Sequence, residues 1–506
     1  MSNPRIWLVG LLVLMVSCST VRNTFTPTSE RSSKREFRGA WIQTVFQNEY
    51  SLMSPDEMKQ DFIRKLDILQ ACGINAIIFQ VRPEADAFYA SDIEPWSRFF
   101  TGEQGKAPEG DFDLMAFLIE ECHKRMMEFH AWLNPYRASA DGKTVFADSH
   151  IYHQHPERFV VYNNQILFDP GIPDNRQYIC SVVRDIVMRY DVDAIHMDDY
   201  FYPYPANGIP FPDEESFLKY GLPEGYSERQ KGDWRRENVN RLISELKRTI
   251  LLTKPWVRFG ISPFGIYRNK SNTPDGSGSE TNGLQNYDDL YADVLHWVRQ
   301  GWIDYNMPQI YWEIGHTAAD YNTLIQWWDA NAYNRPLYIG QDVARTMTAD
   351  QLEDKMTESR RLPHVDGNCF WPANEILWNT NGVADKLQQT YHRYPALIPA
   401  FTHLHEGAPK AVKKLQAEWT VNGYFLHWEA DHSKSNPESA HYYVIYRFDK
   451  NEKKDLNNPA NIIAITDKTN YMLPYEKGTH TFYYIVTAVD RFHNESNKGK
   501  LKKVKL

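Results

Sequence analysis

The amino-acid sequence predicts an α/β fold, a (β/α)8 TIM barrel followed by a small all-β sandwich domain. Three observations lead to this prediction. Between residues 37 and 400, eight strand-like runs succeed one another, each followed by an amphipathic segment, as in barrels of about 200 to over 400 residues. No G-x-G-x-x-G motif follows any of these runs, which argues against the alternative, a doubly wound open sheet. After Pro399 the helical period is lost, and short strands of alternating polarity follow.

The elements expected for the barrel alternate in order along the chain. The strand-like runs are Phe37–Phe46, Asn75–Val81, Phe129–Pro135, Val192–Tyr200, Val257–Phe264, Ile303–Trp312, Pro336–Val343 and Val365–Trp371. The first helix opens with a capping box at Ser54–Glu57. Further helical patterns cover residues 113–126, about 176–190, 239–250, 290–298, a stretch from 317, a segment capped by Thr348 and Gln351, and a last stretch before Tyr391.

The region after the barrel reads as a separate domain at residues 407–506. Its clearest strands are Tyr424–Trp428, His441–Arg447 and Thr481–Val489. A Trp on an early strand and a Tyr-rich late strand suit a β-sandwich. Through the run Tyr484–Asp490 it resembles a fibronectin type III module. We expect a non-catalytic spacer or binding module.

The N-terminus predicts a bacterial lipoprotein. Residues 1–18 combine Arg5 with an apolar run too short to span a bilayer, as in a secretory signal. They end in Met15-Val16-Ser17-Cys18, which resembles a lipobox with Cys18 as the lipidated residue; the alternative is a buried helix with an incidental Cys. Residues 19–36 are polar and suit a tether. The expected location is the cell envelope, on the periplasmic face of the outer membrane.

Composition excludes several classes of protein. The 56 Lys and Arg against 65 Asp and Glu give a net charge of −9 without basic blocks, which argues against a nucleic-acid binder. The four cysteines besides Cys18 are widely spaced and form no C-x-x-C pair, so we expect buried free thiols and no zinc site. We expect no cofactor, and the sequence does not indicate the oligomeric state.

The chemistry of a barrel lies at the C-terminal ends of its strands. The densest polar cluster there is His196–Pro205, at the end of the fourth strand. By alternation, His196, Asp198 and Tyr200 share one face and Asp199 takes the other, unless the strand has already turned. Adjacent carboxylates beside a His fit acid/base work at a glycosidic bond, metal binding, or simple capping of the strand. We favour the first, because the aromatic run that follows suits a groove.

Other strand ends carry amide, guanidinium, carboxylate and aromatic groups that suit hydrogen bonds to hydroxyls and stacking on sugar faces. Aromatic residues make up 14 % of the chain, and those at strand ends favour a sugar-binding cleft over a packed core. The predicted substrate-binding residues are Arg82, Asp86, Asn134, Tyr136, Arg137, His196, Tyr200, Tyr202, Ser262, Phe264, Gln309, Tyr311, Trp312, Gln341 and Trp371.

Several motifs together resemble the glycosyl hydrolase-like family ten over about residues 36–400. They are Phe37–Trp41, Gln80–Pro83, Trp132–Arg137, the His196–Pro205 run, Gly260–Gly265 and Met307–Trp312. The resemblance implies a glycosidase-type barrel with relatives linked to peptidoglycan glycan strands, as hydrolases or lytic transglycosylases. It places Asp198 and Asp199 in the family's most characteristic acidic motif. The same strand also resembles the D-x-x-D-x-D-x-E strand of chitinase-type barrels, but Tyr200 replaces the acidic Glu.

We therefore expect an envelope glycoside hydrolase that cleaves a bacterial cell-wall glycan. Asp198 would act at the anomeric centre, and Asp199 or Glu313 would be the proton donor, kept protonated by apolar neighbours. A carboxyl separation of roughly 6.5–9.5 Å would indicate inversion and roughly 5–5.5 Å retention. The alternatives are a glycosidase of dietary or host polysaccharide, a lytic transglycosylase, and a non-catalytic glycan-binding lipoprotein.

Overall fold

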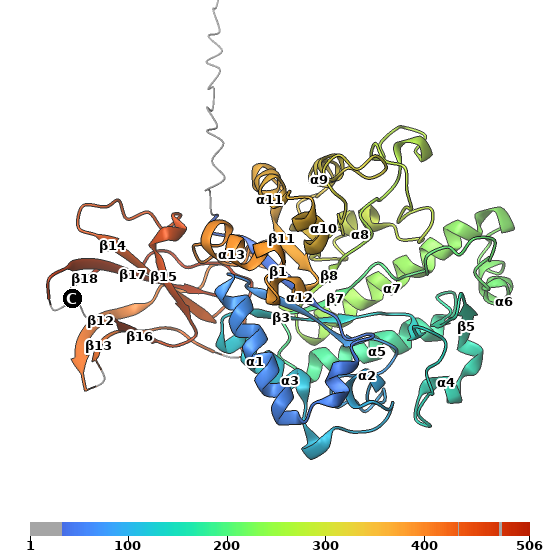
Figure 1. Cartoon of the computed structure of the whole chain (residues 1–506), viewed down its shortest axis with the longest axis horizontal. Coiled ribbons are helices and arrows are strands. Elements are labelled where there is room, and N and C mark those ends of the chain that lie inside the picture. The colour runs from blue at the N-terminus through green and yellow to red at the C-terminus, as the bar shows by residue number, and fades with distance from the viewer. Residues whose placement is uncertain (1–32, 422, 434, 475–477) are drawn as a thin grey trace, which may run out of the picture.

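The computed structural model describes residues 33–506, apart from residues 422, 434 and 475–477. The expected signal peptide with Cys18, and most of the expected tether, lie outside these residues. The described chain forms a closed barrel of eight parallel strands and, beside it, antiparallel sheets (Figure 1). The fold class predicted from the sequence is confirmed.

The barrel strands follow one another in chain order, and the last pairs with the first. They are β1 (Phe37–Ile42), β2 (Ala76–Arg82), β3 (Glu128–Leu133), β7 (Ala194–Met197), β8 (Arg258–Ile261), β9 (Tyr305–Asn306), β10 (Leu337–Asp342) and β11 (Val365–Trp371). Because neighbours are parallel, each connection must cross over the outside of the barrel, and helices make most of these crossings.

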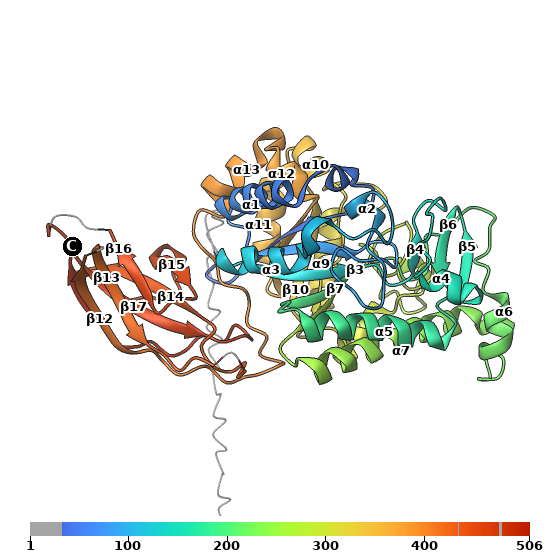
Figure 2. The same cartoon turned by 90° about the horizontal axis from the view of Figure 1, so that it is seen from below.

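The helices surround the strands, as Figure 2 shows from below. The longer ones are α1 (Pro55–Ala71), α3 (Leu114–Lys124), α5 (Pro173–Arg189), α7 (Lys231–Thr253), α8 (Val294–Gln300), α9 (Tyr321–Ala330) and α11 (Leu352–Arg361). Shorter ones are α2 (Arg98–Thr101), α4 (Ile151–Gln154), α6 (Glu214–Ser216), α10 (Val343–Thr348), α12 (Ala373–Leu377) and α13 (Val383–Lys386). The predicted capping box is present at α1, where Ser54 and Glu57 bond each other's backbone N–H.

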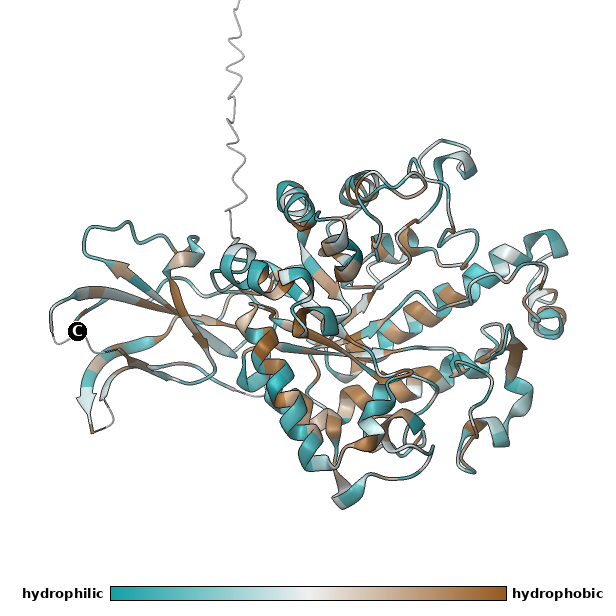
Figure 3. Ribbon diagram, in the orientation of Figure 1, coloured by the Kyte–Doolittle hydropathy of each residue, from teal (hydrophilic) through white to brown (hydrophobic). Residues whose placement is uncertain are grey.

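Alternate residues of the strands enter two different cores. Outward-facing residues such as Phe79 and Phe129 pack with the apolar faces of the helices, such as Phe62 and Leu66 of α1. Figure 3 shows this as brown and teal positions alternating along α1 and α7. Inward-facing aromatic residues fill the barrel itself; the rings of Phe37 and Tyr338 stack 4.0 Å apart. Because the interior is filled, a ligand at the C-terminal strand ends stays at the mouth and does not enter the barrel.

Two long insertions build one side of the mouth. The first follows β3 and contains a small antiparallel sheet of β4 (Arg137–Ser139), β6 (Gln165–Phe168) and β5 (Phe159–Tyr162). The second follows β7. The Tyr162 hydroxyl joins the two, since it accepts the Ala206 N–H at 2.7 Å and donates to the Ile209 carbonyl at 3.2 Å. The sequence analysis did not predict this small sheet.

The C-terminal module consists of two antiparallel sheets. Their strands are β12 (Lys413–Thr420), β13 (Gly423–Glu429) and β16 (Asn470–Leu473) in one, and β15 (Ile462–Thr466), β14 (Tyr442–Asp449), β17 (Thr481–Val489) and β18 (Lys502–Lys505) in the other. Leu426 and Trp428 of the first sheet share a core with Ile445 and Val486 of the second. The three strands expected from sequence are β13, β14 and β17.

Several expected boundaries were wrong. The sixth strand was expected to reach Trp312, but β9 ends at Asn306, shortly before Pro308, which has no N–H for a strand ladder. Thr348 and Gln351 do not cap a helix with their side chains: Thr348 is the last residue of α10, and Gln351 accepts the N–H of Ile314 at 2.7 Å.

Two properties bear on the remaining expectations. Within the described residues, the thiols of Cys72, Cys122, Cys180 and Cys369 are all free, and three of them are buried. None of the helices in that part of the chain has both the length and the apolar character that crossing a membrane requires.

Candidate active site

A cavity of about 470 Å³ lies at the mouth of the barrel, where the C-terminal strand ends meet. It is lined by Trp41, Gln43, Val45, Phe46, Gln80, Trp132, Arg137, Asp198, Asp199, Tyr200, Tyr204, Ser262, Phe264, Gln309, Tyr311, Trp312, Arg345 and Trp371. These residues come from all eight barrel strands or the segments directly after them. This is the position that the barrel architecture predicts for a catalytic site.

Asp198 and Asp199 both line this cavity, although they are adjacent in the sequence. Strict alternation would send them to opposite faces of a strand. The strand β7 ends at Met197, so the backbone has already turned when it reaches the two carboxyl groups. The early end of β7 thus brings a pair of buried carboxyl groups into one site.

Asp198 is surrounded by hydrogen-bond donors. The Trp132 indole N–H donates to its Oδ2 at 3.0 Å, and the Asn134 amide lies 3.3 and 3.4 Å from its two oxygens. The backbone N–H of Tyr200 donates to Oδ1 at 3.2 Å. Burial raises the pKa of Asp198, and the charge of Arg137 together with these donors opposes the rise. The donors favour the ionised carboxylate.

Asp199 is in a different environment. Burial, and then the neighbouring charge of Asp198, raise the pKa of Asp199 to about 7. The Tyr204 hydroxyl and the Gln309 amide, the latter 3.1 Å from Oδ1, donate to its two oxygens and partly oppose this rise. At neutral pH a large fraction of Asp199 therefore carries a proton.

The two carboxyl groups therefore differ in the way that acid/base chemistry requires. Three N–H donors stabilise the anion of Asp198, and burial together with the charge of Asp198 raises the pKa of Asp199 to about 7. A pair of carboxyl groups whose environments separate their pKa values can act together as proton donor and as anionic partner. This arrangement can cleave a bond that needs a protonated leaving oxygen and a developing positive charge nearby.

Aromatic rings form the walls around this pair. Tyr200 and Tyr204 stack with centroids 5.3 Å apart, and Phe264 meets Trp312 edge to face at 5.4 Å. Of the strand-end aromatic residues expected to form a cleft, six line the cavity: Trp41, Tyr200, Tyr204, Tyr311, Trp312 and Trp371. Flat apolar faces with polar edges suit the faces and hydroxyls of a sugar ring.

Ten of the site residues predicted from sequence line the cavity. They are Asp198, Asp199, Arg137, Tyr200, Ser262, Phe264, Gln309, Tyr311, Trp312 and Trp371. The other eight predicted residues, described below, do not line it.

Arg82 and Asp86 are held by other protein groups. The Arg82 guanidinium is fully buried in an ion pair with Glu94, at 2.6 Å, and also bonds the carbonyl of Pro135 at 3.2 Å. It has no free face for a sugar. Asp86 is buried and accepts the side-chain N–H of Gln104 at 3.2 Å, and burial with the charge of Glu84 raises its pKa to about 7.

Three more of the predicted residues lie in the packing beneath the site. Asn134 donates to Asp198 and accepts the backbone N–H of Arg137 at 3.0 Å, and Tyr136 is buried. Tyr202 is enclosed by Phe211 and Tyr291, each 5.1 Å away.

The last three lie deeper in the barrel or outside the cavity. His196 is buried in the barrel interior, and the Gln341 amide donates to Asn368 at 2.6 Å. Glu313, the alternative proton donor, is outside the residues that line the cavity. Of the two candidates for the proton donor, the structure places only Asp199 in the cavity with Asp198.

Several lining residues were not predicted. Trp132 precedes Asn134 by two positions within the strand expected from sequence, so strand alternation could have indicated it. Phe46 has a left-handed backbone (φ 61°) and a ring that is 55 % exposed, which no sequence pattern signals. Arg345 comes from α10, a helix that was not expected. Across the described residues, no group of three or more His, Cys, Asp or Glu side chains is arranged to hold a metal ion.

The chain is similar to known glycosyl hydrolases and to one family of them. Residues 36–357 match the family described as glycosyl hydrolase-like 10. The chain is 39 % identical over 487 residues to "Glycosyl hydrolase YngK" of Bacillus subtilis, covering 92 % of this chain and 93 % of that protein. It is 37 % identical over 350 residues to "Glycosyl hydrolase DigH" of Escherichia coli K12, covering 63 % of this chain and 78 % of that protein. Among solved structures it resembles the PgaB glycoside hydrolase domain of Bordetella bronchiseptica, with a TM-score of 0.47 and 11 % identity; the match covers 70 % of this chain and 98 % of that domain.

Proposed function

Because this chain belongs to the glycosyl hydrolase-like 10 family, we propose that it hydrolyses glycosidic bonds of a bacterial cell-wall glycan, the glycan strand of peptidoglycan. The observation that carries the proposal is the pair Asp198 and Asp199. The two carboxyl groups lie in one aromatic cavity; hydrogen-bond donors oppose the rise that burial causes in the pKa of Asp198, and the pKa of Asp199 is raised to about 7.

The proposed mechanism assigns one task to each carboxyl group. Asp199 gives its proton to the glycosidic oxygen as the bond to the anomeric carbon breaks. The Asp198 carboxylate faces the anomeric centre and stabilises the positive charge that develops there. A water molecule then bonds to the anomeric carbon, and the proton that it loses returns to the Asp199 carboxylate. Tyr204 and Gln309 orient Asp199 through their hydrogen bonds. General acid and base groups of this kind contribute about 10²–10⁴-fold each to the rate.

The choice of an amino-sugar polymer from the cell wall is supported by the character of the cavity. Aromatic residues supply stacking faces. The Gln309 amide N–H groups are taken by Asp199 and the Ser262 carbonyl, and its carbonyl oxygen can accept a hydrogen bond from a hydroxyl or an N-acetyl N–H. Arg345 adds a cation at the rim, with a side chain that is 54 % exposed. Alternate sugars of peptide-stripped glycan strands carry a free lactyl carboxyl group, for which a guanidinium is a suitable partner.

We propose that the protein works from the cell envelope, anchored by lipidation of Cys18. A lipid anchor would hold the enzyme beside its polymeric substrate. Incorporation of labelled palmitate and fractionation of membranes test this directly: the Cys18→Ala variant should lose the label and leave the membrane fraction. Labelling that persists in that variant would refute the anchor.

The function is tested by incubation with intact peptidoglycan, with peptide-stripped glycan strands and with soluble plant and host polysaccharides, followed by mass spectrometry. Reducing ends from the stripped strands are the expected products. Anhydro ends would indicate transglycosylation, and turnover of the soluble polysaccharides alone would overturn the choice of substrate. The Asp199→Asn variant serves as the inactive control for every substrate.

A further inference from the structure

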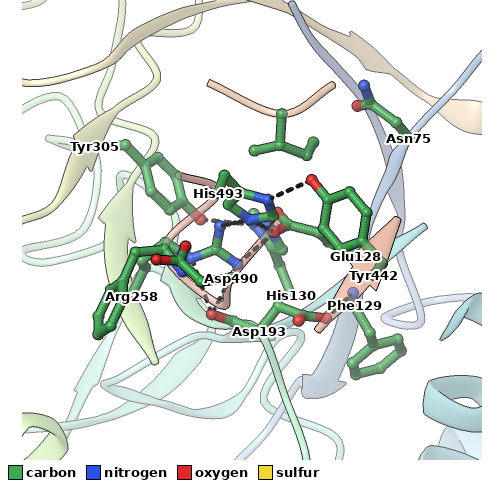
Figure 4. Close-up of polar contacts among 12 residues, drawn as sticks. Asn75, Glu128, Phe129, His130, Asp193, Arg258, Tyr305, Tyr442, Asp490 and His493 are labelled. Atoms are coloured by element: carbon green, nitrogen blue, oxygen red, sulfur yellow. Dashed lines mark hydrogen bonds and ion pairs between the residues drawn. The ribbon is translucent and has the colours of Figure 1, made fainter. Parts of the chain in front are cut away.

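The C-terminal module packs against the N-terminal end of the barrel strands, called here the foot of the barrel, opposite the active site. His493, in the loop after β17, and Tyr442, the first residue of β14, reach the N-terminal ends of the barrel strands (Figure 4). There they meet Glu128, the first residue of β3, and Arg258, the first residue of β8. All four side chains are buried.

Glu128 is the centre of this cluster. Arg258 approaches one of its oxygens at 2.6 Å, His493 approaches the same oxygen at 2.6 Å, and His130 bonds the other at 2.9 Å. Burial alone would raise the pKa of Glu128, but the charge of Arg258 and the contact with His493 hold it well below its usual range. Glu128 is therefore a carboxylate that can only accept hydrogen bonds.

A continuous series of hydrogen bonds leads from this carboxylate up through the barrel. His130 Nδ1 lies 2.9 Å from the Tyr305 hydroxyl, and that hydroxyl lies 3.0 Å from His196 Nδ1. His196 Nε2 lies 3.0 Å from the Ser262 hydroxyl and 3.3 Å from the Trp41 indole nitrogen. Ser262 and Trp41 both line the active-site cavity.

The two ends of this series determine the position of every proton in it. The Trp41 indole can only donate, so His196 Nε2 accepts and its Nδ1–H donates to Tyr305. The Tyr305 hydroxyl then donates to His130 Nδ1, whose Nε2–H donates to Glu128. A neutral His196 agrees with the pKa of that imidazole, which burial and then His130 hold well below its usual value. The two imidazoles and the Tyr305 hydroxyl each donate one proton, and the single lone pair of His196 Nε2 is shared between the Trp41 N–H and the Ser262 hydroxyl.

At the foot, the module completes the same pattern. A nitrogen 2.6 Å from a carboxylate oxygen must carry a proton, because two lone pairs would repel each other. His493 Nε2–H therefore donates to Glu128, and His493 Nδ1 accepts the Tyr442 hydroxyl 3.0 Å away. Arg258 Nη1 also lies 3.0 Å from His493 Nε2; because both nitrogens carry protons, the two side chains interact through the Glu128 oxygen that they share. The module is also tied to the barrel by Arg491, which makes a two-pronged ion pair with Asp191 at 3.0 and 3.1 Å.

We propose that the C-terminal module helps to position residues of the active site. His493 of the module holds Glu128 in place. Glu128 in turn anchors a series of hydrogen bonds through His130, Tyr305 and His196, and this series holds Trp41 and Ser262 in place in the active site. The chain residues are positioning residues and do not touch substrate. Ser262 matters to the chemistry because its carbonyl accepts from the Gln309 amide at 2.8 Å, and this amide also donates to Asp199. The inference extends the proposed function and gives the module a role other than that of a spacer.

Tyr305, in the middle of the hydrogen-bond series, and its neighbour Tyr338 offer a matched pair of variants. Tyr305→Phe removes one hydroxyl and leaves two imidazoles without their partner. Tyr338→Phe makes the same change in a ring 5.4 Å away, whose hydroxyl has no hydrogen-bond partner among the residues that the structure describes. We expect Tyr305→Phe to lower kcat about tenfold with KM nearly unchanged, because misplacement of catalytic groups acts on the transition state. Tyr338→Phe should retain kcat within about twofold. Equal effects of the two changes would overturn the proposal.

The contribution of the module is tested at His493. His493→Leu removes the donor to Glu128, whereas His493→Gln retains an N–H that can reach the carboxylate. We expect a loss of kcat in His493→Leu and recovery of most of it in His493→Gln. In the double variant His493→Leu/Tyr305→Phe, the loss in kcat should be smaller than the product of the two single losses, because both changes break the same series of hydrogen bonds. Losses that multiply fully would show that the module and the chain act independently.

A spectroscopic measurement makes the test independent of the proposed function. In protein labelled with ¹⁵N-tryptophan, the Trp41 indole signal is assigned by its absence from Trp41→Phe. We expect this signal to shift in Tyr305→Phe and in His493→Leu, and to stay in place in Tyr338→Phe and His493→Gln. An unmoved Trp41 signal in Tyr305→Phe and His493→Leu would refute the proposed series of hydrogen bonds. This conclusion would hold even if the substrate of the enzyme proved to be a different glycan.

Discussion

The indole N–H of Trp132 donates a 3.0 Å hydrogen bond to Oδ2 of Asp198. The two residues lie on neighbouring barrel strands or directly after them, and Asn134, two positions further along the chain, donates to the same carboxylate. The C-terminal end of β3 thus supplies both side chains that orient the Asp198 carboxylate, which follows the adjacent strand β7. The orientation of Asp198 is a property of the barrel and not of a flexible loop.

Replacing Trp132 by Phe removes this donor and keeps most of the ring. A hydrogen bond to a charged acceptor contributes about 1.5–3 kcal/mol, so we expect a loss in kcat of roughly 10- to 100-fold. The pKa of Asp198 should also rise, so the acidic limb of the pH profile should move to higher pH. Trp234→Phe is the control, because this buried indole N–H has no partner in the described part of the chain. Similar kinetics for the two variants would contradict the role of the Trp132 bond.

Asp199→Asn removes the proposed proton donor with little change in shape. We expect kcat to fall by about 10²–10⁴-fold, measured as release of reducing ends from peptide-stripped glycan strands. Asp366→Asn is the matched control. Burial raises the pKa of Asp366 to about 6, but this residue lies at the foot of β11, away from the cavity. Retention of full activity by Asp199→Asn would exclude it as the acid.

The pH profile should have a basic limb near pH 7. The proton donor must be protonated, and the pKa of Asp199 is about 7, so the rate falls as the pH rises through this value. The Tyr204 hydroxyl stabilises the ionised form and lowers this pKa. Tyr204→Phe should therefore move the basic limb to higher pH, whereas Tyr200→Phe should leave it in place. A limb that moves to lower pH in Tyr204→Phe would contradict the assignment.

Arg82→Met should destabilise the fold rather than weaken substrate binding. The change leaves Glu94 buried without its partner, and loss of one member of a buried ion pair costs about 3–5 kcal/mol. Urea denaturation followed by circular dichroism measures the effect, and KM of the folded fraction should be unchanged. Lys410→Met breaks the exposed pair with Asp431 and should leave the denaturation midpoint where it is. A raised KM with normal stability would restore Arg82 to the substrate site.

Local patterns were sufficient for the architecture but not for every boundary. The alternation of strand and helix predicted all eight barrel strands and placed the acidic pair at the mouth. The sequence could not show that β7 ends at Met197, although this decides that Asp199 joins Asp198. It also could not separate Arg82 from the true lining residues, because its partner Glu94 lies twelve positions away in a loop. The pairing of distant side chains leaves no periodic signal.

By itself, the sequence determined the barrel, the strand ends that carry the chemistry, and the residue types that suit a sugar. These follow from hydrophobic periodicity and from the rule that parallel strands bring their C-terminal ends together. The tertiary structure decided which of those polar groups face the cavity, which carboxyl group holds the proton, and that His493 meets Glu128. Protonation depends on burial and on nearby charges, and both arise only when segments far apart in the chain pack together.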